Sequence, residues 1–227
     1  MEHREYRYEL HCHTKEVSRC GRVPAADIVR AYKEKGYDGI VITDHYSDLT
    51  FRGRSFFCPQ RHIERYLSGY RNALQAAGDN FTVLLGMELR FYATVNDYLV
   101  YGVSEDFLRN SGNLLGMYQR RFFRMADKNG LLVLEAHPFR AMHTPAKRKY
   151  LHGCEVFNGK DRNPEINRRA QRWYEKCGFS IRAGGSDFHD YPQLALGGIA
   201  VNEPIKSNAD LIRVLKSGNF RILNAGE

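Results

Sequence analysis

The stretch Glu9-Leu10-His11-Cys12-His13-Thr14 closes a predicted strand over Tyr6–His11 and places two histidines two positions apart. Side chains two apart in an extended chain point the same way, so the two imidazoles share a face and form a two-armed clamp for a cation. Cys12, between them, points the opposite way, and we expect it in the core. The same arrangement, a strand followed by ligand-type side chains, recurs along the chain and indicates the fold.

Short apolar runs alternate with longer helical patterns through the whole chain. We expect strands over the apolar runs Tyr6–His11, Gly39–Thr43, Phe81–Leu89, Tyr98–Val103, Leu131–Ala136, Cys154–Phe157, Ser180–Ala183 and Ile199–Val201. We expect helices between them, over residues 24–36, Phe57–Ala77, Asn113–Asn129, Pro164–Lys176 and Asn208–Lys216. Such alternation is typical of parallel β/α units, and about seven of them fit either a closed barrel or an open sheet.

Imidazoles and carboxylates gather at nearly every strand terminus, mostly the C-terminal one. These residues are His11, His13, Asp44, His45, Glu88, Asp97, His137, Asp187 and His189. Active sites of parallel barrels lie on that face, whereas an open sheet concentrates its chemistry at one switch point. The spread over all units therefore favours an α/β barrel. Mixed nitrogen and oxygen ligands without thiolate predict a site for zinc, manganese or iron.

The composition limits the class of protein. The chain has 227 residues, of which 43% are hydrophobic, and this is enough for one domain with its own core. Its apolar runs are too short to span a bilayer, and no secretory signal is expected at the N-terminus. The five cysteines form no C-x-x-C motif, which favours reduced thiols and a cytoplasmic protein. A net charge of +8 favours anionic partners without choosing between a small phosphate ester and nucleic acid.

Taken together, these motifs resemble the PHP family, named for polymerase and histidinol phosphatase. The matching segments are Glu9-Leu10-His11-Cys12-His13-Thr14, Ile42-Thr43-Asp44-His45, Gly86-Met87-Glu88, His137-Pro138 and Gly185-Ser186-Asp187-Phe188-His189. They run from residue 9 to residue 189, so the resemblance covers most of the chain. It implies a single PHP domain over residues 1–227, folded as a distorted (β/α)7 barrel.

The resemblance also implies a ligand set for about two to three divalent ions, zinc, manganese or iron. One ion would be held by His11, His13, Glu88 and Asp187. Glu88 would bridge to a second ion, shared with Asp97 and His137. A third would be held by His45, His189 and a residue after the first motif, which aligns here as Glu16. Many members have histidine where Asp97 stands, and aspartate is a competent oxygen ligand at that position.

The activity that the resemblance implies is metal-assisted hydrolysis of a phosphate ester by activated water. Asp44 and Asp187 are candidates for orienting histidines or moving protons. Arg140, three residues after His137, is the first candidate for gripping the phosphate, with Lys160 and Arg90 next.

Three functions remain open from the sequence. A small-molecule phosphatase is favoured. A nuclease that acts on oligonucleotide ends is the alternative, since the net charge suits it, although only about forty residues separate Asp97 from His137 and leave little room for a nucleotide-reading insertion. The third is a non-catalytic module that serves a polymerase, against which stands the nearly intact ligand set. The substrate and the oligomeric state stay open.

Overall fold

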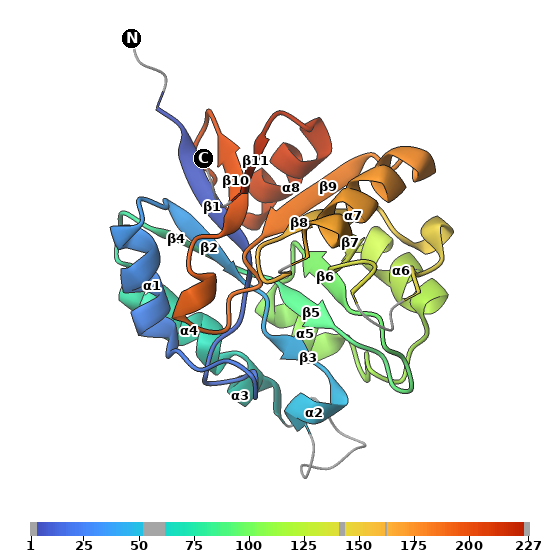
Figure 1. Cartoon of the computed structure of the whole chain (residues 1–227). Helices are drawn as coiled ribbons and strands as arrows, with labels where there is room; N and C mark the ends of the chain where they lie inside the picture. Colours follow the sequence, from blue (N-terminus) through green and yellow to red (C-terminus); the bar gives the residue numbers. More distant parts are fainter. Residues whose placement is uncertain (1–3, 52–61, 141–143, 162, 225–227) are drawn as a thin grey trace.

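Two mixed sheets, rather than the expected closed barrel, organise the chain in this computed structural model, which describes residues 4–51, 62–140, 144–161 and 163–224 (Figure 1). The first sheet has the order β11-β10-β1-β2-β4, with strands Arg221–Asn224, Gly197–Val201, Tyr6–Cys12, Gly39–Ile42 and Thr82–Leu85. The second has the order β3-β5-β6-β7-β8-β9, with strands His45–Tyr46, Met87–Leu89, Tyr98–Tyr101, Leu132–Glu135, Gly153–Asn158 and Ile181–Gly185. The α/β class is as expected, but the sheets are not closed and the barrel is not confirmed.

Strand direction explains part of the difference between the expected barrel and the observed open sheets. β5 pairs antiparallel with β6, and β6 with β7, whereas the alternation predicted parallel units. Residues 90–97 connect β5 to β6, and a parallel crossover needs about a dozen residues or more. A short connection therefore forces the antiparallel pair, and it turns Asp97 toward the end of β5 that carries Glu88.

One of the expected strands divides between the sheets, and another is followed by a strand that was not expected. The run Phe81–Leu89 forms β4 and β5, separated at Gly86, where a Cβ would meet Val41 Cγ1 at 2.9 Å and Val100 O at 3.1 Å. Only glycine fits such a close approach. Similarly, β2 ends at Ile42 and the chain resumes as β3 at His45. These breaks move Glu88 and His45 into the second sheet, where they pair in register.

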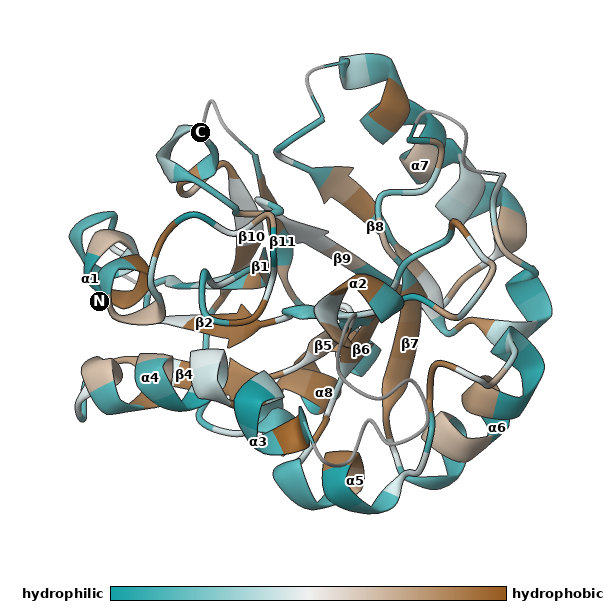
Figure 2. Cartoon of the chain, turned by 90° about the horizontal axis from the view of Figure 1, so that it is seen from below, coloured by the Kyte–Doolittle hydropathy of each residue, from teal (hydrophilic) through white to brown (hydrophobic). Residues whose placement is uncertain are grey.

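Helices surround the strands (Figure 2). They are α1 (Ala25–Glu34), α2 (Asp48–Phe51), α3 (Ile63–Tyr66), α4 (Ser68–Ala77), α5 (Glu105–Asn110), α6 (Gln119–Lys128), α7 (Pro164–Cys177) and α8 (Asn208–Ser217). α7 shows why the sequence places them well: the Asn163 side chain accepts from Glu165 N, proline opens the helix, and Gly178 ends it with φ of 59°. None of the helices in the described ranges is long and apolar enough to cross a membrane.

Some boundaries differ from expectation. The helix expected over Asn113–Asn129 begins only at Gln119, because the Asn113 side chain accepts from Gly116 N and holds a turn there. The helix expected over Phe57–Ala77 forms α3 and α4, and its first residues lie outside the described ranges. Helix α5 and strand β11 were not predicted. Ser104 caps α5 by accepting from Phe107 N, a local signal that the apolar pattern did not carry.

The core has three parts. One lies between the strands, with Leu10, Leu99 and Leu134 buried against Leu211 and Leu215 of α8. The second lies between the second sheet and its helices α5, α6 and α7, and the third between the first sheet and helices α1 and α4. Cys12 is fully buried in the third part, as its orientation between two histidines predicted. Polar side chains occupy the ends of the strands that lie outside these three parts of the core.

Candidate metal centre

Seven of the predicted ligands meet at one end of the strands, and we call this set the metal centre. Three groups of these side chains have ligand atoms that all lie within 4.8 Å of one another: His11, Glu88 and His137; His11, His13 and Asp187; and His13, His45 and His189. All are buried except His45, which is partly exposed. Imidazole and carboxylate donors in overlapping groups are the set that zinc, manganese or iron accepts.

Backbone pairing brings the first and last motifs together. His13 N donates to Phe188 O at 2.9 Å, and Phe188 N donates to His11 O at 3.0 Å. The end of β1 and the segment after β9 therefore lie side by side, as an isolated parallel bridge between Cys12 and Phe188 also records. Asp187 adopts φ of 51°, a conformation that aspartate tolerates better than most side chains. Residues far apart in the sequence thus converge on one point.

Glu88 occupies the middle of the metal centre. His137 Nε2 donates to its Oε1 at 2.8 Å, and His45 Nδ1 lies 2.6 Å from its Oε2. The Nε2 atoms of His11 and His13 lie 3.4 Å from Oε1 and Oε2 respectively. Burial alone would raise the pKa of Glu88, but His45 and His11 hold it well below its ordinary value. An ionised carboxylate whose two oxygens face different histidines has the geometry of a bridging ligand.

Glu155 orients His11. Its Oε1 accepts from His11 Nδ1 at 2.8 Å, and its Oε2 accepts from His137 N at 2.7 Å and from Asn158 Nδ2 at 3.0 Å. This leaves His11 Nε2 directed at Glu88 and Asp187. Burial lowers the pKa of His11, but the carboxylates of Glu155, Asp187 and Glu88 outweigh it and raise that pKa well above its ordinary value. The sequence analysis missed Glu155, whose only signal was a charged residue inside an apolar strand.

A chain of contacts through Asp44 and Ser18 orients His13. Asp44 accepts from Ser18 Oγ at 2.7 Å, and Ser18 Oγ lies 3.3 Å from His13 Nδ1. Asp44 also accepts from Thr14 N and Thr14 Oγ1, both at 2.7 Å, and burial raises its pKa to about 6. Asp44 therefore holds the loop after β1 and reaches His13 through Ser18. It lies in none of the three groups of the described residues that could hold a metal.

The donor set fits metal ions. Among the residues that the structure describes, His11 Nε2 and His13 Nε2 are buried without a hydrogen-bond partner. Such atoms are costly unless a ligand satisfies them. In His189, Nδ1 donates to Asp187 O at 2.8 Å, and Lys160 Nζ lies 3.4 Å from Nε2. The rings of His11 and His13 thus each have one nitrogen held by the protein and the other available to a ligand.

Arg140 and Lys160 lie beside Asp187. Arg140 Nη2 donates to Asp187 Oδ2 at 2.8 Å and to Asn158 Oδ1 at 3.1 Å, while Nε donates to Asp161 Oδ1 at 3.1 Å. Lys160 Nζ lies 3.7 Å from Asp187 Oδ2. Burial would raise the pKa of Asp187, but His11, His13 and the two cations hold it well below its ordinary value. Arg140 thus holds the side chain of Asp187, and its expected grip on phosphate stays a prediction.

Arg90 and Asp97 form a two-pronged ion pair. Arg90 Nε donates to Asp97 Oδ1 at 2.6 Å, and its Nη2 pairs with Oδ2. His137 Nε2 lies 3.7 Å from Asp97 Oδ2. The structure places Asp97 next to the metal centre, but outside the three groups of described residues that could hold an ion. Arg90 keeps about a third of its side chain exposed, and its expected contact with phosphate stays a prediction.

Glu16, the expected ligand of a third ion, belongs to none of the three groups of described residues that could hold a metal. Both of its carboxylate oxygens accept from Ala25 N at 3.1 Å, and Oε1 also accepts from Asn72 Nδ2 at 3.2 Å. An acidic side chain at the start of a helix satisfies the free amide groups there. Glu16 therefore stabilises the beginning of α1 instead of reaching His45 and His189.

Glu9 is a buried carboxylate that supports the metal centre, and the sequence analysis also missed it. Its Oε1 accepts from His11 N at 2.8 Å and from Ser186 N at 2.9 Å, and its Oε2 accepts from Tyr32 OH at 2.7 Å. Burial raises the pKa of Glu9 to about 7. A single buried carboxylate thus ties β1, β9 and α1 together beneath the ligands.

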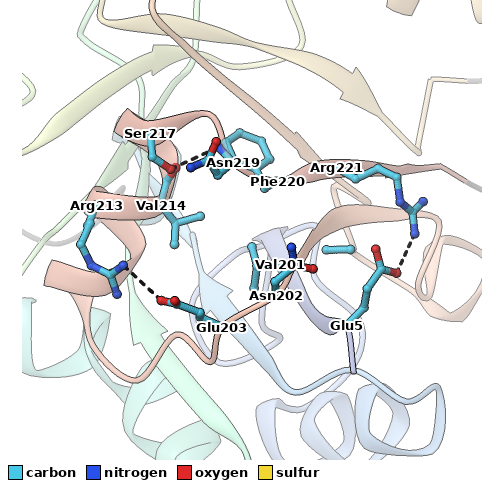
Figure 3. A pocket seen from close by; sticks show the side chains of 11 residues that line it. Glu5, Val201, Asn202, Glu203, Arg213, Val214, Ser217, Asn219, Phe220 and Arg221 are labelled. Carbon is cyan, nitrogen blue, oxygen red and sulfur yellow. Dashed lines mark hydrogen bonds and ion pairs between the residues drawn. The ribbon is translucent and has the colours of Figure 1, made fainter. Parts of the chain in front are cut away.

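Of two cavities in the structure, one borders the metal centre and the other is lined by different residues. One of about 120 Å³ borders the metal centre and is lined by Cys20, His45 and Arg90, among others. A larger one of about 550 Å³ lies between β10, β11 and α8 (Figure 3). Its charged side chains pair with one another, Arg213 with Glu203 and Arg221 with Glu5. The smaller cavity is the better candidate for a substrate because His45, a residue of the metal centre, lines it.

Comparisons with known proteins agree with this geometry. The family described as PHP domain matches residues 9–183. Among solved structures, PsfC from Pseudomonas syringae PB-5123 is similar with a TM-score of 0.69 and 17% identity, covering 98% of this chain and 92% of that one. A proposed metal-dependent phosphoesterase from Bifidobacterium adolescentis has a TM-score of 0.52 and 15% identity, covering 81% and 87%.

A third similar structure is an amidohydrolase from Chromobacterium violaceum with bound sulfate and no metal. Its TM-score is 0.51 at 13% identity, covering 97% of this chain and 98% of that one. No curated protein matches the chain. At these identities the solved structures establish a shared fold, and the residues of the metal centre carry the argument about chemistry.

Proposed function

This chain belongs to the PHP domain family, and from that premise we propose that it is a metal-dependent hydrolase of phosphate esters, with a small phosphorylated molecule as its favoured substrate. The observation that carries the proposal is Glu88. Its two oxygens face separate pairs of histidines, and the Nε2 atoms of His11 and His13 have no hydrogen-bond partner among the described residues.

The three overlapping groups would hold about two to three divalent ions. His11, His13 and Asp187 would hold the first, and Glu88 and His137 would hold the second. His45 and His189 would contribute to a third, beside His13. When bound, such ions supply an activated water and offset the charge of phosphoryl oxygens.

The side chains around the ions position them and receive the substrate. Glu155 and the Ser18–Asp44 relay hold His11 and His13 in the required tautomers. Arg140 keeps Asp187 ionised and in place. Lys160 and Arg90 keep 35% and 34% of their side chains exposed at the rim, where they can attract an anionic substrate.

A nuclease that acts on oligonucleotide ends is the second candidate. The net charge of +8 favours it. Between β6 and β7, however, the described chain contains only α5 and α6, with little space for a base-reading module. Binding of single-stranded oligonucleotides that falls steeply with salt would support this candidate.

A panel of phosphate esters tests the proposal. Sugar phosphates, histidinol phosphate, nucleotides and short oligonucleotides are assayed with added manganese, zinc or iron, and ions are counted by elemental analysis. We expect hydrolysis that requires metal, stops with a chelator, and survives in the Glu203→Gln control, since Glu203 is exposed and belongs to none of the ligand groups of the described residues. Protein that is folded and loaded with metal, yet inactive on the whole panel, would contradict it.

A further inference from the structure

We propose that Asn158, at the end of β8, is a positioning residue of the metal centre. Its carboxamide holds one carboxylate oxygen of Asp187, so that Asp187 presents only its other oxygen to an ion. The inference deepens the proposed function and rests on its claim that the chain binds metal. Asn158 carries no charge and does not ligate, and the sequence analysis did not select it.

An irregularity in β8 turns Asn158 toward the metal centre. Side chains three apart in a regular strand point to opposite faces, so Glu155 and Asn158 would lie on different sides of the sheet. In the pairing of β8 with β9, however, Glu155 lies opposite Ala183 and Phe157 lies opposite Gly184, so β8 holds one extra residue. Such a bulge re-aims the side chains that follow it. Glu155 and Asn158 therefore share a face.

The carboxamide of Asn158 is fully engaged. Its Nδ2 donates to Glu155 Oε2 at 3.0 Å and to Asp187 Oδ2 at 3.3 Å. Its Oδ1 accepts from Arg140 Nη2 and from Lys160 N, both at 3.1 Å. The reversed amide would set its oxygen against two carboxylates and its nitrogen against two donors, so these neighbours determine its orientation. One neutral group thus separates two buried carboxylates and supports the arginine beside them.

Asn167, in the first turn of α7, holds the backbone of Asn158. Asn158 N donates to Asn167 Oδ1 at 2.9 Å, and Asn167 Nδ2 donates to Asn158 O at 3.1 Å. The side chain of Asn158 is buried, with 1% of the residue exposed. A two-point contact from a helix therefore fixes the end of β8, and the carboxamide is placed by bonds that involve no ligand of the metal centre.

The two oxygens of Asp187 consequently have different surroundings. Oδ2 accepts from Arg140 Nη2 at 2.8 Å as well as from Asn158. Oδ1 lies 3.5 Å from His11 Nε2 and 3.4 Å from His13 Nε2, two atoms that have no hydrogen-bond partner within the described residues. Hydrogen bonds to a ligating carboxylate orient it toward its ion. Oδ1 is therefore the atom of Asp187 that joins the two imidazoles, while Oδ2 is engaged by the protein.

Metal affinity tests the positioning role. Metal-free full chain is titrated with Zn²⁺ in competition with a chromophoric chelator. We expect Asn158→Leu, which fills a similar volume without donors or acceptors, to bind Zn²⁺ about 10- to 100-fold more weakly than the wild type. Asn208→Leu is the matched control, because the Asn208 carboxamide donates to Val103 O at 2.8 Å beside α8. It should lower the Tm and leave the affinity unchanged.

The visible spectrum of bound Co²⁺ tests the claim about the oxygens, since absorption weakens as the number of ligands around Co²⁺ increases. Leucine at position 158 removes one donor to Asp187 Oδ2 and a partner of the other donor, Arg140. Both oxygens of Asp187 can then bind the ion. At saturating Co²⁺ we expect weaker absorption per bound ion in Asn158→Leu than in the wild type and Asn208→Leu. A loss of stability alone would not change this spectrum.

The outcomes separate the two claims. A folded Asn158→Leu variant with wild-type affinity, or with the wild-type spectrum at saturation, would overturn the role of Asn158 and leave the hydrolase proposal standing. An equal loss of affinity in Asn208→Leu would do the same. A folded wild type that binds no metal would overturn both.

Asn167→Ala provides a second variant in case Asn158→Leu does not fold. It leaves the carboxamide of Asn158 in place and removes only the two bonds to its backbone. We expect a smaller loss of Zn²⁺ affinity in the same direction, with circular dichroism like that of the wild type. An unchanged affinity in this folded variant would contradict the proposal that α7 positions Asn158.

Discussion

His11 Nδ1 donates a hydrogen bond to Glu155 Oε1 at 2.8 Å, and this contact determines that His11 presents Nε2 to the metal centre. The other oxygen of Glu155 accepts from the backbone of His137, so one buried carboxylate positions two ligands on different strands. Because it orients ligands without being one of them, its contribution can be measured separately from theirs.

Glu155→Gln should lower metal affinity about 10- to 100-fold while leaving the fold intact. The glutamine amide can still accept from His137 N, but its nitrogen would donate toward His11 Nδ1 and favour the tautomer that cannot ligate. Metal titration of chelator-treated protein measures the effect. Glu135→Gln is the matched control, because Glu135 is a buried carboxylate that accepts from Ala146 N and Asn96. Equal losses in the two variants would mean that the effect is structural.

Glu88→Ala should abolish turnover and reduce the number of bound ions, because it removes the side chain that faces four histidines. His11→Ala and Asp187→Ala should also abolish turnover. Rates, ion content and circular dichroism should be measured on the same preparations. A Glu88→Ala variant that turns over near the wild-type rate would rule out a bridging carboxylate.

Arg140→Lys should weaken catalysis by about 1.5–3 kcal/mol in transition-state stabilisation despite the retained charge, since lysine cannot hold Asp187, Asn158 and Asp161 together. If Arg140 acts through Asp187, kcat and metal affinity fall together. If it also grips the phosphate, as the sequence analysis expected, KM rises as well. Arg168→Lys, on the exposed face of α7, serves as the control. Kinetics within about twofold of wild type would leave Arg140 without either role.

Glu9→Gln should change how stability depends on pH. Burial raises the pKa of Glu9 from 4.5 to about 7, so the folded state binds this proton more tightly than the unfolded state does. The cost of ionising Glu9 is therefore absent at low pH and grows as pH rises between these two values, to about 3 kcal/mol. Glutamine cannot ionise, and it can still accept from His11 N and Ser186 N.

Thermal unfolding of metal-free protein, with a chelator present, measures this difference. The Tm of Glu9→Gln minus that of the wild type should increase from pH 5 toward about pH 7 and then level off. Glu203→Gln, an exposed carboxylate, should show a constant difference over the same range. Parallel curves for Glu9→Gln and the wild type would contradict the raised pKa.

Local sequence was sufficient for most of the elements and for naming the seven side chains that the structure brings together. Asn163, Pro164 and Gly178 mark the ends of α7 through interactions within a few residues, and the predicted helix agrees with the observed one to within a residue. The spacing of His11 and His13 places both on one face of β1 because side chains alternate along any extended chain. These features depend on residues that are close together in the chain, so the sequence alone predicts them.

The tertiary structure decided which residues from distant parts of the sequence come into contact. The short connection of residues 90–97 turned an expected parallel unit into an antiparallel pair, and the strands formed two open sheets. The loop after β1 folded so that Glu16 reached the beginning of α1. Glu155 became the partner of His11 although 144 positions separate them. Such contacts depend on strand order, sheet breaks and loop closure, which are set by packing between distant segments, and a pattern of spacings within one segment contains no information about them.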